Sequence, residues 1–247
     1  MAYIIWNFPK FILGFGLAND AITSTYTSAG FLEYLAVLIA LAAVVMGVRG
    51  VHISAIEHAS ESRMDNVSLF MGRVAMMLIV LLVMVMFYEV VLRYVFEKPT
   101  LWANELSLWM AGFIFLLAGL YAMQQRSHIR IYLIYDMMPR WAQKTSDVVS
   151  VVLIWAFTVS MIWGGLGEAQ AKILRWETFG TAFDPPIPAT LKPMVLLVIL
   201  LVSVQAIANL IADWNKAPEH HAPVDEAEIE ELKQDLAERV EDKSKGA

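Results

Sequence analysis

The chain has 247 residues, of which 58% are hydrophobic and 17% are charged, and its formal net charge is −6. Soluble domains average about half apolar residues, so this composition indicates an integral membrane protein. The absence of cysteine excludes disulfide bonds, thiolate metal sites and cysteine nucleophiles. Most of the negative charge belongs to the end of the chain, because residues 216–247 contain ten acidic and five basic side chains.

Five apolar segments are long enough to cross a bilayer, which takes about 20 largely uncharged residues in a helix. The first runs from about 31 to 48 and contains one charge, Glu33, near its start. The other four are expected at about 70–96, 103–125, 148–168 and 191–213. The predicted fold is therefore an all-α integral membrane protein with about five transmembrane helices.

The segments that connect these spans differ in character. Residues 49–69 form a polar connector, and a tight hairpin around Pro99 joins the second and third spans. The basic connector 126–147 also carries apolar residues that suit an amphipathic helix lying in the headgroup plane. The long loop 169–190 contains the sequence Asp-Pro-Pro-Ile-Pro, whose paired prolines exclude a continuing helix.

The carboxyl-terminal tail is predicted to contain an acidic helix. Within residues 224–243, apolar side chains recur every three or four positions and so share one face, namely Ile229, Leu232, Leu236 and Val240. A solvated terminal helix and a weak coiled contact with a partner are both consistent with this pattern.

The distribution of Lys and Arg predicts the orientation, because short cytoplasmic loops carry an excess of these residues. With five spans, the connectors 49–73 and 126–144 lie on the same side as Lys216, and that side holds eight Lys or Arg against five on the other. We therefore expect an outside amino terminus and a cytoplasmic carboxyl terminus.

Polar residues gather at the ends of the second and third spans. Glu89 and Arg93 are four residues apart, with the acid first, which is the favourable order for an ion pair on a helix. The pair is either an anchor at the membrane surface or a contact to a neighbouring subunit. Trp102 and Glu105 lie at the start of the third span. Tryptophan is common at membrane interfaces, and a glutamate at the amino end of a helix interacts favourably with the helix dipole. Because the hairpin is tight, we predict that Glu105 pairs with Arg93.

The basic connector is expected to bind lipid headgroups. Anionic lipids attract Lys and Arg near the membrane surface at about 1 kcal/mol each. The candidate residues are Arg126, His128, Arg130, Arg140 and Lys144.

Small residues in the third and fourth spans allow helices to approach closely. The main candidates for a subunit interface are Gly112 and Gly119, and Gly164, Gly165 and Gly167 offer the same possibility in the fourth span. These glycines pack either within the chain or against a partner.

No motif for an enzyme is present in the sequence. It contains no HExxH, GxSxG, Walker A or GxGxxG pattern, and no span has a histidine in its middle that could bind haem. We therefore expect no catalytic residue, no metal site, no cofactor and no nucleic-acid partner.

Several of these residues together resemble a known family. Arg93-Tyr-Val-Phe with Pro99, Trp102 and Glu105, followed by His128-Ile-Arg-Ile, is similar to the small membrane subunit of the tripartite ATP-independent periplasmic (TRAP) transporters. Asp184-Pro-Pro-Ile-Pro, Lys192-Pro193 and Gln205 resemble the larger members of that subunit family. The family pattern usually continues His-Ile-Arg with Val-Asp, whereas Ile131 and Tyr132 stand here.

The resemblance implies that the chain is divided into three regions. Residues 1–67 form an amino-terminal extension with one extra span, residues 68–214 form the four family-like helices, and residues 215–247 form the acidic cytoplasmic tail. It also implies a place in the bacterial inner membrane, with membrane lipids around it. The partners are then a large permease subunit and a periplasmic substrate-binding protein.

The function implied by the resemblance is that of a non-catalytic small permease subunit. Such a subunit scaffolds the large one during sodium-coupled uptake of an organic acid that the binding protein delivers. Two other interpretations of the residues stay open at this point: a membrane anchor for a respiratory or signalling complex, and an autonomous channel.

Overall fold

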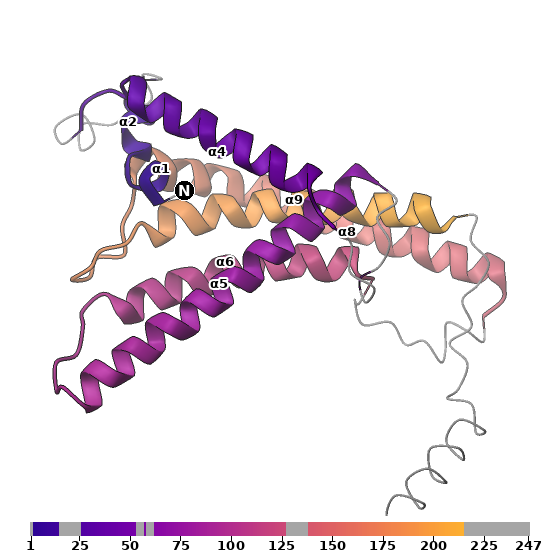
Figure 1. Cartoon of the computed structure of the whole chain (residues 1–247). Helices are drawn as coiled ribbons and strands as arrows, with labels where there is room; N and C mark the ends of the chain where they lie inside the picture. The colour runs from indigo at the N-terminus through magenta and orange to yellow at the C-terminus, as the bar shows by residue number, and fades with distance from the viewer. Residues whose placement is uncertain (1, 15–25, 53–56, 58–61, 127–137, 215–247) are drawn as a thin grey trace, which may run out of the picture.

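The computed structural model describes residues 2–14, 26–52, 57, 62–126 and 138–214 (Figure 1). Within these ranges the secondary structure is helical, and five helices are long and apolar enough to cross a membrane. They are α4 (Phe31–Arg49), α5 (Arg63–Tyr94), α6 (Ala103–Gln124), α8 (Arg140–Arg175) and α9 (Ile187–Asp213). Two short helices, α1 (Ala2–Trp6) and α2 (Phe8–Gly14), precede them. The prediction of an all-α membrane protein with five spans is confirmed.

Three of the helices begin before the apolar runs that were predicted to cross the membrane. Helix α5 begins at Arg63, where Ser62 and Asp65 form a reciprocal capping box: Asp65 N–H donates to Ser62 Oγ (3.1 Å) and Ser62 N–H to Asp65 Oδ2 (2.8 Å). Helix α8 begins at Arg140 and ends at Arg175, so residues 140–147 are its first two turns. Helix α9 starts at Ile187 with Pro188 in its first turn, where proline is tolerated.

Two predicted helices fall in parts of the chain that are not described. Most of the amphipathic connector, residues 127–137, and the acidic tail, residues 215–247, lie outside the described residues. Both predictions therefore stay predictions.

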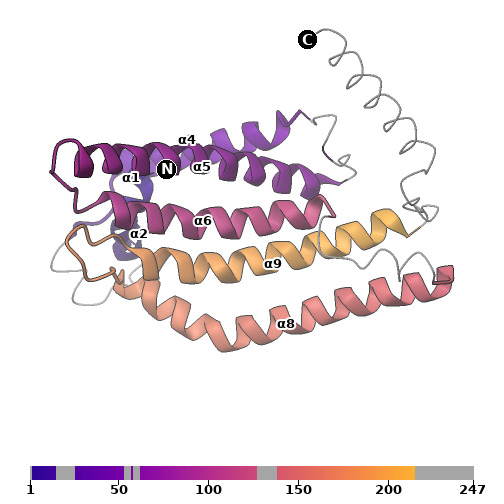
Figure 2. The same ribbon diagram turned by 90° about the horizontal axis from the view of Figure 1, so that it is seen from below.

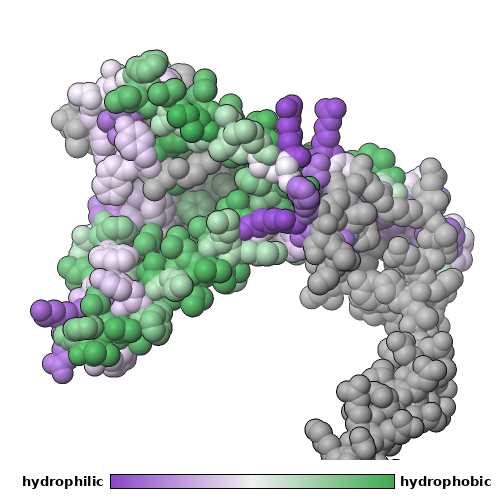
Figure 3. All heavy atoms as spheres, viewed as in Figure 1, coloured by the Kyte–Doolittle hydropathy of each residue, from purple (hydrophilic) through white to green (hydrophobic). Residues whose placement is uncertain are grey.

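The four helices α5, α6, α9 and α8 lie side by side in one layer, in that order (Figure 2). Neighbours in the row make the main contacts between helices, and the row has two broad faces. A single layer has little interior, so many large apolar side chains remain exposed. Figure 3 shows these apolar side chains over α4 and over the arm formed by α5 and α6. In a bilayer these surfaces can face lipid tails, which are as apolar as the side chains themselves.

Helix α4 lies on one face of this row and is held near its two ends (Figures 1 and 2). At one end Gly47 lies against the ring of Phe70 on α5. At the other, Lys10 of α2 pairs with Glu33 (2.7 Å) and Phe11 meets Tyr34 edge to face. All 19 residues of α4 are described, and none of them is buried.

Helix α8 is longer than a membrane span needs. It has 36 residues, whereas about 20 residues in a helix cross the hydrocarbon core. Two of its tryptophans are highly exposed, Trp141 at 73% and Trp163 at 88%, and tryptophan is favoured at membrane interfaces. The charged residues of its last turns, Glu168, Lys172 and Arg175, suit a position outside the hydrocarbon core.

Candidate functional site

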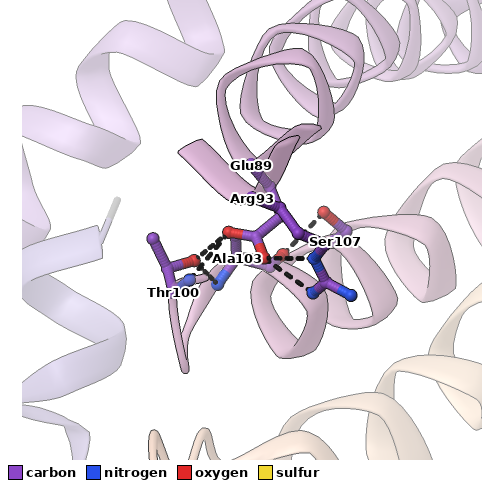
Figure 4. A network of polar contacts seen from close by, with 5 residues as sticks. All are labelled: Glu89, Arg93, Thr100, Ala103 and Ser107. Carbon is purple, nitrogen blue, oxygen red and sulfur yellow. Dashed lines mark hydrogen bonds and ion pairs between the residues drawn. The ribbon is translucent and has the colours of Figure 1, made fainter. Parts of the chain in front are cut away.

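The hairpin between α5 and α6 contains a closed polar cluster around Glu89 (Figure 4). Glu89 is 3% exposed, and its Oε1 accepts hydrogen bonds from Arg93 Nη2 (2.7 Å) and Nε (3.2 Å). Its Oε2 accepts from the backbone N–H of Thr100 (3.1 Å) and from the Thr100 hydroxyl. Thr100 Oγ1 in turn accepts from Ala103 N–H (3.3 Å) at the start of α6. One carboxylate thus fixes both the end of α5 and the beginning of α6.

Glu105 lies apart from this cluster, so the predicted pair with Arg93 is wrong. Its Oε2 accepts a hydrogen bond from Thr181 Oγ1 (2.6 Å), in the loop between α8 and α9. Arg93 instead uses the acid one turn before it on its own helix, Glu89. The i,i+4 spacing holds these two together without any help from the hairpin.

Trp102 closes the hairpin by an aromatic contact. Its ring stacks on that of Tyr88, with the ring centroids 6.1 Å apart and the planes tilted by 29°. The pair packs α5 against the first turn of α6 at the membrane surface, where both residue types are favoured.

The opposite ends of α6, α8 and α9 are joined by the cations that were expected to face lipid. Arg126 forms a two-pronged ion pair with Asp213, with both N–O distances at 2.7 Å. Arg140 donates to Gln143 Oε1 (3.3 Å) and to the Asp213 carbonyl (3.5 Å), and Lys144 Nζ lies 4.8 Å from the Trp214 ring centre. His128 and Arg130 lie outside the described residues. Headgroup binding by these five residues stays a prediction.

A buried amide network, which the sequence analysis missed, links α5, α6 and α9. Gln205 is fully buried, accepts from Ser68 Oγ (2.8 Å) and donates to Asp65 Oδ1 (2.6 Å) and Asn209 Oδ1 (2.9 Å). Asn209 Nδ2 donates to the Met123 carbonyl (2.7 Å) at the end of α6. The signal was present in the sequence, because Gln205 and Asn209 are one turn apart in an otherwise apolar span.

Two further polar contacts tie α9 to its neighbours. The hydroxyls of Thr158 on α8 and Ser203 on α9 lie 2.5 Å apart and are buried. Trp109 Nε1 of α6 donates to Thr190 Oγ1 of α9 (2.8 Å). Hydrogen bonds therefore join α9 to α5, α6 and α8, and α5 is tied to α6 through Thr100 in the hairpin turn.

The candidate glycines fall into two groups. A Cβ built at Gly112 would lie 2.5 Å from Leu191 Cδ1 of α9, and one at Gly165 would lie 3.1 Å from Leu196 of the same helix. Gly119, Gly164 and Gly167 have nothing within 4 Å of their Cβ positions. The first group packs inside the chain, and the second leaves room for something else to approach.

Among the described residues, no group of three or more His, Asp or Glu is placed to hold a metal ion. The ionisable side chains described above are instead paired with each other or with hydroxyl and amide groups near the helix ends. The geometry is that of a framework whose polar groups join helices.

Comparison with known proteins gives one family match. A family model described as "Tripartite ATP-independent periplasmic transporters, DctQ component" matches residues 82–216, which is more than half of the chain. The match begins within α5 and includes α6, α8 and α9, whereas α1, α2 and α4 precede it. No curated protein matches the chain.

Proposed function

Since this chain belongs to the DctQ component family, and is thus the small permease subunit of a TRAP transporter, we propose that it is a non-catalytic scaffold for the large permease subunit. The complex would take up an organic acid that a periplasmic binding protein delivers, with sodium as the coupling ion. In this proposal the substrate and the sodium ions bind to the other subunits.

The use of polar groups in the row of helices supports this proposal. Both oxygens of Glu89 are used within the α5–α6 hairpin, the amide of Gln205 joins α9 to α5, and Asp213 pairs with Arg126. A solute pathway needs convergent polar groups that a substrate can reach. A scaffold needs helices held in fixed positions, which is what these contacts provide.

Reconstitution tests the proposal. The large subunit and the binding protein, taken from neighbouring reading frames, are co-expressed with or without this chain, and sodium-driven uptake into proteoliposomes is measured. We expect uptake to require the chain and the substrate affinity of the binding protein to be unaffected by it. Stoichiometric binding of solute or sodium to the isolated chain would contradict the proposal, as would full uptake without the chain.

We also propose that the chain lies in the bacterial inner membrane with a periplasmic amino terminus and a cytoplasmic carboxyl terminus. The protein has no cysteine, so single cysteines can be labelled without background. We expect a membrane-impermeant maleimide to reach Ala182→Cys, in the loop after α8, from the periplasm. Arg63→Cys, at the other end of the row, should react after permeabilisation; the reverse pattern would contradict this orientation.

A further inference from the structure

The amino-terminal extension lies against one broad face of the helix row, along α5 and across one end of the row (Figure 2). Helix α4 touches α5 where Gly47 meets Phe70. Near the other end of α4, Phe8 of α2 stacks on Trp176 at the end of α8, with the ring centroids 5.2 Å apart. The extension therefore crosses from one edge of the row, α5, to the other edge, α8 (Figures 1 and 2). A second membrane domain cannot lie flat on this face without displacing the extension.

The other broad face is open. In Figure 2, α6 and α9 are seen with no described segment in front of them, and α4 lies behind the row. The exposed residues of α6 recur every three or four positions along one stripe, namely Asn104, Leu108, Phe115, Ala118 and Gly119. Since this is the single exposed stripe of α6, it belongs to the open face.

The exposed stripes of α6 and α9 differ in composition. The stripe of α9 consists of bulky aliphatic residues, as suits contact with lipid tails: Leu197, Leu200, Val204, Ile207 and Ile211. The stripe of α6 combines the 79% exposed ring of Phe115 with the small residues Ala118 and Gly119. A glycine within a helix is unfavourable unless its missing side chain allows a close approach. Gly112 has such a neighbour inside the chain, whereas Gly119 does not.

We propose that the large permease subunit docks on the open face, with one of its apolar helices crossing α6 at Gly119 and packing against Phe115. The inference rests on the proposed function, which supplies the partner, and it adds the face that the partner covers. Because the extension already lies against the opposite face, along α5 and across one end, the partner and α4 lie on different sides of the row. The row is then held between its own extension and the large subunit.

A matched pair of glycine substitutions tests the inference. Gly119→Leu and Gly164→Leu place the same side chain at two helix positions that are equally open within the chain. In the co-expressed complex, we expect Gly119→Leu to reduce recovery of the large subunit at least tenfold and to reduce uptake in parallel. Gly164→Leu should leave both unchanged. Equal recovery with the two variants overturns the inference.

Cross-linking tests the same face of the row without relying on correct folding of the Gly119→Leu variant. Phe115→Cys on the open face and Leu38→Cys on the exposed surface of α4 are each treated with a short thiol-to-amine reagent in native membranes. We expect an adduct with the large subunit from position 115 and none from position 38. An adduct from position 38 alone, an adduct of two small subunits, or no protein adduct from position 115 each overturns the assignment of the face.

The wild-type complex separates the two proposals. If the large subunit does not co-purify with the wild-type chain, the proposed function itself fails. If it co-purifies with the wild type and equally with Gly119→Leu, the scaffold function stands and the choice of face is wrong.

Discussion

The four helices of the row and helix α4 are all apolar and long enough to cross a membrane, yet they are packed in different ways. The row is joined by buried side chains such as Gln205, Ser203 and Thr158. Helix α4 has no buried residue and is held by contacts near its ends. Water does not drive apolar helices together inside a bilayer. The difference teaches that small residues and buried hydrogen bonds decide which spans pack, and that hydrophobicity decides which segments enter the membrane.

The largest loss of stability is expected from Gln205→Leu, which affects the packing of the row. The substitution removes the amide that joins Ser68, Asp65 and Asn209, and it takes a hydrogen-bond donor from the buried Asp65 carboxylate. Loss of such a partner costs about 1–3 kcal/mol. We expect a clear decrease in the melting temperature of the detergent-solubilised chain, followed by circular dichroism.

Val204→Leu is the control, because Val204 is the exposed neighbour of Gln205 on the same helix. An unchanged melting temperature for Gln205→Leu would mean that the row does not depend on its amide network.

A smaller effect, confined to α4, is expected from Gly47→Leu. A Cβ at this position would lie 2.3 Å from the ring of Phe70, so either that ring must turn aside or α4 must move away from α5. We expect a cost of about 1 kcal/mol, at the low end for overpacking because α4 can shift into lipid. Hydrogen exchange should increase in α4 and remain unchanged in α6 and α9.

Phe70→Ala supplies the matched rescue. The double variant with Gly47→Leu should restore slow exchange in α4, since the substituted side chain then has room. Equal exchange in the single and double variants would show that Gly47 does not set the position of α4.

A smaller loss of stability is expected from substitutions of Glu89 in the hairpin cluster. Glu89→Gln keeps an oxygen for Thr100 and removes the charge that pairs with Arg93, whose side chain is 49% exposed to its surroundings. Glu89→Ala removes both contacts. We expect the melting temperature to fall in the order wild type, Glu89→Gln, Glu89→Ala, and Glu105→Ala to behave as the wild type. An equal decrease for Glu105→Ala would contradict the separation of these two acids.

The smallest effect concerns the contact between α2 and α4. The hydrogen bond from Lys10 to Glu33 raises the pKa of Lys10 above its ordinary value of 10.5. A raised pKa means that this contact adds stability below pH 10.5 and that the gain is lost as the pH rises through the higher pKa. NMR titration of isotopically methylated lysines should show a high pKa for Lys10 that returns to the ordinary value in Glu33→Gln.

The sequence was sufficient to predict the five spans, because largely uncharged runs long enough to cross a bilayer are typical of transmembrane helices. It was insufficient at the helix ends outside the hydrocarbon, where capping by Ser62 and Asp65 extends α5 beyond its apolar part. The partner of Glu105 was missed because Thr181 is 76 residues away and reaches it through the fold. Gln205 was noticed through a family resemblance, but its contacts with Ser68 and Asp65 were missed because the sequence does not place α5 beside α9.

The different lengths of α4 and α8 have a consequence for how each helix fits a bilayer. Helix α4 has 19 residues, or about 28 Å, whereas α8 has 36 residues, or about 54 Å. The hydrocarbon core is about 30 Å thick, so α4 matches it when upright. Helix α8 must tilt or extend into the headgroup region, and the two helices therefore place different demands on the lipids beside them.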